Sequence, residues 1–386
     1  MANTKPKINE HFLRLDHLVR QHKELGDKLD ALRIDKAEQD RRFEAAFFEK
    51  RSSLEEWMEG LTLLADGMLQ VTLELARAEL RPVYGLPRFT DNDGNFLASG
   101  FAIIGMGKLG GRELHFGSDL DLIFVFDRNG NTQGPRALSN REYFAKLAQR
   151  MISYLSLHTR YGYLYKVDTE LRPSGNAGTL VTNLETWISY YHEHAALWEK
   201  QALLKARLIH ADEGFDKPFA GLFKRLIFLN PFPESFGDEI NRLRQRIERE
   251  LAKESNRRWH YKKGFGGVID IEFMVQFLQL KLGKVYDSIL TPNTLEAIER
   301  LATMRVLNAD EIADLKKAYR FYREMEIYLE VKYKLKEGYL DPENEWVPQL
   351  AEDMGFSEKD DFLQAFDRLR QAVRRIYGKV FHVDGA

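Results

Sequence analysis

The stretch Gly105-Met-Gly-Lys-Leu-Gly-Gly-Arg-Glu-Leu-His-Phe-Gly-Ser-Asp-Leu-Asp-Leu-Ile-Phe-Val-Phe126 decides the fold class. It ends in the apolar run Leu120–Phe126, and the shorter apolar run Phe101-Ala-Ile-Ile104 comes just before it. Apolar runs of this length, bounded by glycines, are typical of buried strands. We therefore expect two strands that are joined by a glycine-rich turn.

An acidic pair, Asp119 and Asp121, lies at the start of the second expected strand. Because side chains alternate along a strand, both carboxylates point to one face, with Cα atoms roughly 6.5–7 Å apart. Carboxylates this close repel each other and raise each other's pKa, and a divalent cation removes that penalty. Hard oxygen ligands favour Mg²⁺ over zinc. The pair therefore predicts a magnesium site.

The turn before the pair is suited to phosphate binding. Glycines allow the backbone to approach a ligand closely, and successive backbone N–H groups can cradle phosphate oxygens. Lys108 would add a positive charge and Ser118 would orient a phosphate, although each could equally be an ordinary turn residue. Neither the Walker loop nor the dinucleotide-binding fingerprint is present. We expect nucleotide contacts from the turn and its surroundings, namely from Gly107, Lys108, Gly110, Gly111 and Ser118.

A third carboxylate, Asp168, closes the expected strand Gly162–Asp168. Placed beside the acidic pair, it could bind a metal or accept a proton from an attacking hydroxyl. Arg172 could offer its guanidinium to a phosphate, or it could anchor its own loop. Two carboxylates on one strand, a preceding glycine turn and a third carboxylate on a later strand form the nucleotidyltransferase arrangement. Its chemistry is in-line attack on an α-phosphate with two Mg²⁺ ions.

Helical periodicity dominates on both sides of this region. Ser53-Leu-Glu-Glu56 has the pattern of a capping box, and we expect Pro82 to stop the helix that it begins. We predict an α+β fold with three regions. These are an N-terminal helical region at 1–84, a small mixed-sheet nucleotidyltransferase core at 85–215, and a C-terminal helical bundle at 216–386.

Composition excludes several classes of protein. The 386 residues include 57 Lys and Arg and 59 Asp and Glu, a net charge of −2, which argues against binding nucleic acid through bulk charge. With no cysteine, the chain cannot hold an iron–sulfur cluster or use a cysteine nucleophile. It contains no apolar run long enough to span a membrane and no signal-peptide pattern, so we expect a cytoplasmic protein.

The sequence also resembles the bacterial glutamine synthetase adenylyltransferases. The resemblance rests on four ordered motifs. The first is the part of the quoted stretch at 105–114 followed by 117–124. The others are Val-Asp-Thr-Glu-Leu-Arg-Pro-Ser-Gly-Asn-Ala-Gly at 167–178, Trp-Glu-Lys-Gln-Ala-Leu-Leu-Lys-Ala-Arg at 198–207 and Gly-Gly-Val-Ile-Asp-Ile-Glu-Phe at 266–273. Enzymes of this family have two related halves. One half attaches AMP to a tyrosine of glutamine synthetase, and the other removes it by phosphorolysis. The chain is long enough for one half and is more similar to the C-terminal, adenylylating half.

The resemblance implies roles for individual residues. Asp119 and Asp121 would be metal ligands and Asp168 the third carboxylate, while Glu170 departs from the basic or small residue more usual there. ATP would be the nucleotide, glutamine synthetase the protein substrate, and the signalling protein PII a possible regulator. Three alternatives remain open at this stage: removal of AMP, transfer of a nucleotide to another acceptor, and a binding module whose active site has decayed.

Several further charged residues, within the later motifs and in the stretch between them, allow a functional or a structural interpretation. Lys205 and Arg207 could reach a triphosphate. Asp270 and Glu272 could approach the nucleotide or could pair with cations from another helix. The basic stretch from Arg242 to Lys263 is typical of a solvated helix face, and a docking surface for an acidic partner is the alternative.

Overall fold

The structure is a computed structural model that describes residues 10–255 and 257–382. The chain forms two compact units, Met1–Asn230 and Pro231–Ala386. The expected regional boundaries at 84/85 and 215/216 stay predictions. Within the described ranges, no helix combines the length and the apolar character needed to cross a membrane.

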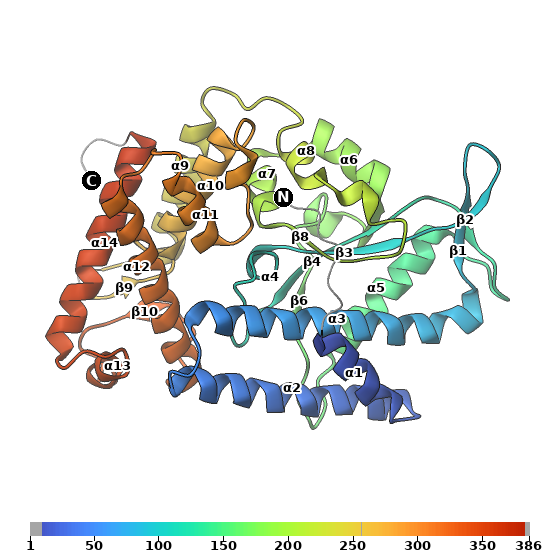
Figure 1. Cartoon of the computed structure of the whole chain (residues 1–386), viewed down its shortest axis with the longest axis horizontal. Coiled ribbons are helices and arrows are strands. Elements are labelled where there is room, and N and C mark those ends of the chain that lie inside the picture. The colour runs from blue at the N-terminus through green and yellow to red at the C-terminus, as the bar shows by residue number, and fades with distance from the viewer. Residues whose placement is uncertain (1–9, 256, 383–386) are drawn as a thin grey trace. The chain divides into compact units, whose positions relative to one another are not determined.

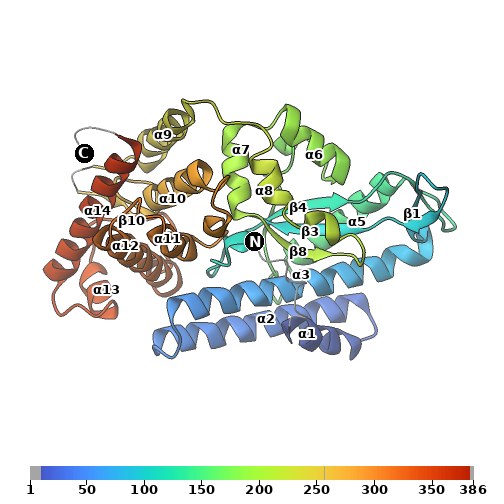
Figure 2. The same cartoon turned by 45° about the horizontal axis from the view of Figure 1, so that its top comes forward.

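Three helices begin the first unit: α1 (Glu10–Arg20), α2 (Leu25–Phe48) and α3 (Leu54–Tyr84). Figures 1 and 2 both show α2 lying alongside α3. The helix α3 is rich in buried apolar residues, because its Leu, Met and Ala side chains recur at helical spacing on the faces that it packs against its neighbours.

The helix α3 begins as the sequence predicts and ends later. The Ser53 hydroxyl accepts the backbone N–H of Glu56, and the Glu56 carboxylate accepts the N–H of Ser53, so the capping box is confirmed. The expected stop at Pro82 is wrong, since the helix continues to Tyr84. A proline so close to a helix end removes only one hydrogen bond of the last turn. Gly85, with a φ of 75°, ends the helix instead.

A five-stranded mixed sheet forms the centre of the first unit. Its strands are β3 (Phe101–Gly105), β4 (Leu120–Phe126), β6 (Val167–Asp168), β7 (Val181–Asn183) and β8 (Arg207–Ala211). The strands run in the order β6-β4-β3-β8, and β7 also pairs with β4. β3 lies antiparallel to β4 and β8, whereas β6 and β7 are parallel to β4. The small mixed sheet confirms the predicted fold class.

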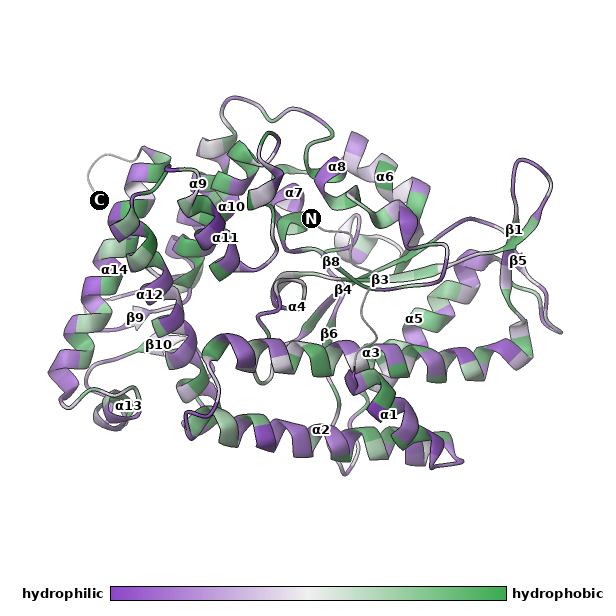
Figure 3. Cartoon of the chain, in the orientation of Figure 1, coloured by the Kyte–Doolittle hydropathy of each residue, from purple (hydrophilic) through white to green (hydrophobic). Residues whose placement is uncertain are grey.

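The two strands predicted from the apolar runs at 101–104 and 120–126 are buried, as expected. Every residue of β3 is buried, and so is every residue of β4 except Asp121. The ring of Phe101 stacks on those of Phe124 and Phe144, the last from α5 (Asn140–Ser156). Hydropathy colouring shows the strand β3 in green, between helices that carry both colours (Figure 3).

The third expected strand is much shorter than the sequence suggests. Only Val167 and Asp168 pair with β4. The reason lies just upstream, where the N–H groups of Leu164 and Tyr165 both donate to the carbonyl of Leu155 at the end of α5. The backbone is therefore bonded to the helix there and reaches the sheet only at residue 166, whose carbonyl accepts the N–H of Leu120 at 2.9 Å.

The remaining elements of the first unit are short. A separate sheet has the order β2-β1-β5, with β1 (Pro87–Thr90), β2 (Phe96–Ala98) and β5 (Asn131–Thr132). The other helices and helical turns are α4 (Gly107–Gly111), η1 (Gly175–Ala177), α6 (Leu184–Glu193), α7 (Leu197–Ala202), η2 (Leu203–Lys205), η3 (Lys217–Phe219) and α8 (Leu222–Ile227).

The second unit is mainly helical, which confirms the predicted C-terminal helices. Its helices and helical turns are α9 (Phe236–Ile247), η4 (Glu248–Ala252), α10 (Val268–Leu282), η5 (Asp287–Ile289), α11 (Thr294–Ala302), α12 (Ala309–Ile327), η6 (Tyr328–Lys332), α13 (Val347–Asp353) and α14 (Lys359–Phe381). The strands β9 (Trp259–His260) and β10 (Tyr339–Leu340) pair antiparallel. Green and purple segments alternate along α14 in Figure 3, as expected for an amphipathic helix.

Candidate active site

Asp121 and Asp168 lie opposite each other in the sheet. The parallel strands β4 and β6 pair in a register that sets Leu120 against Val167 and Asp121 against Asp168. Residues directly opposite on neighbouring strands direct their side chains to the same face. The sheet therefore brings together two carboxylates that are 47 positions apart in the sequence, and Asp119 lies one residue before the start of β4.

The electrostatics of Asp121 reflect this crowding. Burial is the main cause that raises its pKa to about 7, and the neighbouring carboxylates of Asp168 and Asp119 raise it further. The ammonium group of Lys108 acts in the opposite direction. Carboxylates crowded together in this way suit a hard divalent cation such as Mg²⁺.

The glycine turn packs against Asp121. Its short helix α4 begins at Gly107, and the N–H of Met106 donates to the Asp121 carbonyl at 2.9 Å. Gly107 has a φ of 53°, and a Cβ atom there would lie 2.3 Å from Asp121 Oδ2. Because any other residue would collide with the carboxylate, the turn requires glycine at this position.

Lys108 is held by a residue that the sequence analysis did not select. Its ammonium group contacts Nε2 of His115. The other ring nitrogen, Nδ1, lies 2.9 Å from the Phe116 carbonyl, so Nδ1 carries the proton and Nε2 can accept from Lys108. The hydroxyl of Ser118 accepts the N–H of His115 at 3.2 Å. His115 is not part of a recognisable pattern of metal ligands in the sequence. Only its position inside the glycine-rich stretch could have indicated a role.

Gly110 and Gly111 are buried within the turn. A Cβ atom at Gly110 would lie 1.7 Å from the carbonyl oxygen of Lys205, so this glycine serves close packing of two backbone segments. Contacts between these glycines and a nucleotide stay predictions.

Arg172 is bonded within its own loop. Its Nη1 donates to the Thr169 carbonyl at 2.6 Å and to the Thr169 hydroxyl at 2.9 Å. Asp168 accepts the N–H of Glu170 at 2.7 Å, and Glu170 in turn accepts from Asn176 at 2.8 Å. Arg172 therefore shapes the loop that follows Asp168, and its expected contact with a phosphate stays a prediction.

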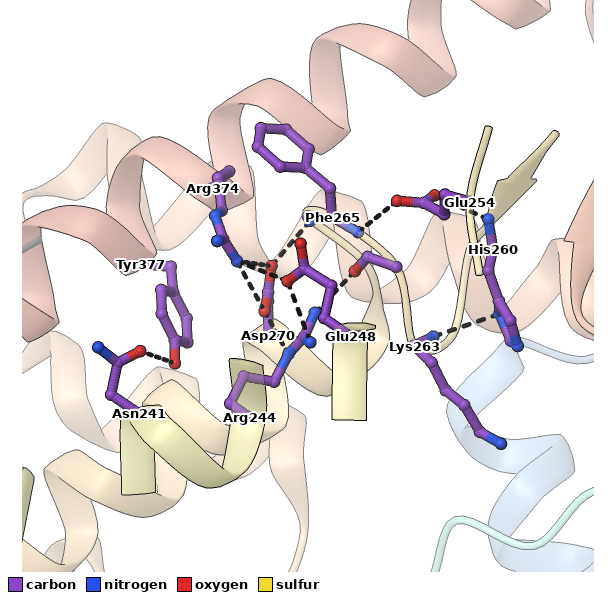
Figure 4. Close-up of polar contacts among 12 residues, drawn as sticks. Asn241, Arg244, Glu248, Glu254, His260, Lys263, Phe265, Asp270, Arg374 and Tyr377 are labelled. Atoms are coloured by element: carbon purple, nitrogen blue, oxygen red, sulfur yellow. Dashed lines mark hydrogen bonds and ion pairs between the residues drawn. The ribbon is translucent and has the colours of Figure 1, made fainter. Parts of the chain in front are cut away.

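Asp270 and Glu272 belong to the second unit and pair with arginines. Asp270 and Arg244 are both 0% exposed, with Oδ1 and Nε 2.5 Å apart. Arg374 lies 3.3 Å from the same carboxylate, and Figure 4 draws this contact as a dashed line. Glu272 accepts from Arg323 at 2.8 Å. Of the two interpretations, pairing with cations from other helices is the one confirmed, because Arg244, Arg374 and Arg323 come from α9, α14 and α12.

The architecture of the first unit is that of a nucleotidyltransferase. A small mixed sheet carries the acidic pair at the start of β4, a glycine turn precedes the pair, and a third carboxylate lies in register on the next strand. The family model for glutamate-ammonia ligase adenylyltransferase matches residues 2–221, more than half of the chain. The chain belongs to this family. A second family model, GlnD PII-uridylyltransferase, matches residues 235–381.

Curated relatives agree with the family assignment. A protein from Thioalkalivibrio sulfidiphilus is 39% identical over 267 residues, which cover 68% of this chain and 27% of the relative. One from Alteromonas mediterranea is 34% identical over 327 residues, 83% of this chain and 33% of the relative. Both are named bifunctional glutamine synthetase adenylyltransferase/adenylyl-removing enzyme. The chain thus spans about a third of the length of these relatives.

Proposed function

We propose that the chain is an adenylyltransferase that moves AMP from ATP to a tyrosine of glutamine synthetase and releases pyrophosphate. The observation that carries the proposal is the register of Asp121 and Asp168, together with the pKa of about 7 that burial and the neighbouring carboxylates give Asp121. The names of the relatives support the choice of acceptor.

The chain's own residues would perform most of the chemistry. Asp119, Asp121 and Asp168 would hold two Mg²⁺ ions, which, when bound, neutralise the charge of the carboxylates and of the triphosphate. The phenolic oxygen of the tyrosine forms a bond to the α-phosphorus of ATP, and the bond from that phosphorus to the β-bridging oxygen breaks. Asp168 accepts the proton of the tyrosine hydroxyl group, whose unperturbed pKa is about 10. The glycine turn and Lys108 position the phosphates.

Transfer of label from [α-³²P]ATP to glutamine synthetase tests the proposal. In the presence of Mg²⁺, the wild-type chain should label the acceptor, and Asp119→Asn and Asp121→Asn should each reduce the rate at least 100-fold. Asp127→Asn is the matched control, since this half-buried carboxylate follows the opposite end of the same strand. Wild-type rates from the Asp119 and Asp121 variants would refute the proposed mechanism.

The opposite reaction, phosphorolytic removal of AMP, is the second candidate because the relatives are named for both activities. It would use the same carboxylates. Adenylylated glutamine synthetase supplied with phosphate should release ADP if the chain performs this reaction. Binding of Mg·ATP without labelling or ADP release would indicate another acceptor, whereas absence of Mg·ATP binding would favour a binding module with a decayed site.

The proposal implies a cytoplasmic protein, since ATP and glutamine synthetase would both be substrates. Regulation by the signalling protein PII, which the family resemblance implies, stays a prediction. A pull-down of PII by the chain, with and without ATP, would test it.

A further inference from the structure

The side of the glycine turn away from Asp121 rests on residues 205–207. Gly110 packs on the Lys205 carbonyl so closely that a Cβ atom would lie 1.7 Å from that oxygen. Arg207, the first residue of β8, is paired in register with Gly105 of β3. The turn is therefore in backbone contact with this segment both at its beginning and in its middle.

Two ion pairs reinforce this backbone contact. Lys205 Nζ lies 2.6 Å from Glu113 Oε2, and the Glu113 side chain is 1% exposed. Glu113 follows α4 by two residues, and its N–H donates to the Lys108 carbonyl at 2.8 Å. Because a buried carboxylate without its cation is strongly unfavourable, this pair fixes the end of the turn relative to Lys205.

Arg207 forms the second pair and also touches the turn itself. Its two terminal nitrogens donate to the two oxygens of Asp66, on α3, at 2.7 and 2.9 Å. The nitrogen Nη2 also donates to the carbonyl of Leu109, within α4, at 3.0 Å. A planar guanidinium can donate in fixed directions to the Asp66 carboxylate and to the Leu109 carbonyl at the same time. The ammonium group of a lysine cannot reproduce this geometry. The guanidinium of Arg207 therefore binds groups of the protein itself, namely the Asp66 carboxylate and the Leu109 carbonyl.

The turn thus lies between two groups of charged residues. Gly107 meets the Asp121 carboxylate on one side, while Asp66, Glu113, Lys205 and Arg207, which we call the turn clamp, hold the other. A shift of the turn by about 1 Å would move Gly107 and Lys108 relative to Asp121, and misplacement on that scale can cost 100-fold in rate.

We propose that the turn clamp consists of positioning residues, which set the affinity for the phosphates of Mg·ATP by holding the glycine turn against the acidic site. The inference rests on the proposed function, and it assigns Lys205 and Arg207 to the protein scaffold. In this arrangement the ion pair with Asp66 holds the Arg207 side chain in place. The hydrogen bond from Arg207 to the Leu109 carbonyl then holds the turn in place.

Arg207→Lys is the first test, with Mg·ATP binding measured by calorimetry and the melting temperature measured in parallel. A lysine can still pair with Asp66 but cannot keep the bidentate contact and the bond to Leu109 together. We expect the Kd for Mg·ATP to rise at least tenfold with little change in melting temperature. Arg112→Lys is the matched control, because Arg112 caps α4 and forms an exposed pair with Glu59. It should stay within twofold of wild type.

The exchanged double variant Asp66→Arg/Arg207→Asp separates the ion pair from the turn contact. It restores opposite charges but removes the Arg207 donor to Leu109, so we expect the melting temperature to stay near that of wild type and the affinity to stay low. Wild-type affinity in the double variant, or an Arg207→Lys variant that loses melting temperature but keeps wild-type affinity, would overturn the clamp and leave the proposed function standing. A wild-type chain that does not bind Mg·ATP would instead remove both proposals.

Discussion

Asp168 faces Asp121 across two parallel strands, and its Oδ1 accepts the N–H of the residue two positions later, Glu170, at 2.7 Å. An asparagine keeps an acceptor for that N–H and removes only the charge. We therefore expect Asp168→Asn to retain the fold and to lose at least 100-fold in AMP transfer, measured with labelled ATP.

Asp91→Asn provides the matched control for this variant. Asp91 also accepts the N–H of the residue two positions later, Asp93, at 3.0 Å, but it lies in an exposed turn. The control should transfer AMP at the wild-type rate. Equal losses in the two variants would mean that the local turn, and not the charge of Asp168, supports activity.

The contact between Gly107 and Asp121 leads to a second prediction. An alanine at 107 would place its Cβ 2.3 Å from the Asp121 carboxylate, whereas Gly94, which also has a positive φ, has open space around it. Each Gly→Ala change should cost about 1–2 kcal/mol of unfolding free energy because of the left-handed backbone. Only Gly107→Ala should also reduce AMP transfer, by about 100-fold. Comparable activity in both variants would contradict a role for this contact.

The sequence predicted those features of the site that depend on neighbouring residues. It did not predict the contacts between residues that are far apart in the chain. Asp119 and Asp121 are two residues apart, so the sequence was enough to predict that their charges act on each other, and the charge of Asp119 does help to raise the pKa of Asp121. The partners of Lys205 and Arg207 lie 92 and 141 positions away, and tertiary packing selects them. The expected strand at 162–168 is shortened by backbone hydrogen bonds to the Leu155 carbonyl. These bonds also depend on tertiary packing, so the local sequence does not predict them.

Asp212 gives a prediction for the pH dependence of stability. Although burial alone would raise its pKa, the hydrogen bond from His210 and the charge of Arg77 lower it to about 2. A lowered pKa stabilises the folded state above the unfolded value of 3.8, and this contribution is lost as the pH falls toward 2. Asp212→Asn should therefore cost about 2 kcal/mol at pH 7 and progressively less below pH 4.

Urea unfolding of wild type and Asp212→Asn at pH 7, 4 and 3 would measure that difference. Asp93→Asn is a useful control, since Asp93 is exposed in a turn and its substitution should cost little at any of the three pH values. A difference between wild type and Asp212→Asn that is constant from pH 7 to pH 3 would show that the charge of Asp212 does not contribute.

The pair of Asp270 and Arg244 in the second unit supplies the strongest stability prediction. Both side chains are 0% exposed, and Arg374 and the N–H of Gly266 also contact the Asp270 carboxylate. Asp270→Ala removes the fully buried carboxylate and leaves Arg244 and Arg374 to share the more exposed Glu248, so it should cost about 3–5 kcal/mol of unfolding free energy. Glu337→Ala is the comparison, because its pair with Arg258 is exposed (46% for Arg258 and 78% for Glu337) and should contribute at most about 1 kcal/mol. Chemical denaturation would measure both changes. Equal costs would mean that water reaches the Asp270 carboxylate and screens its charge.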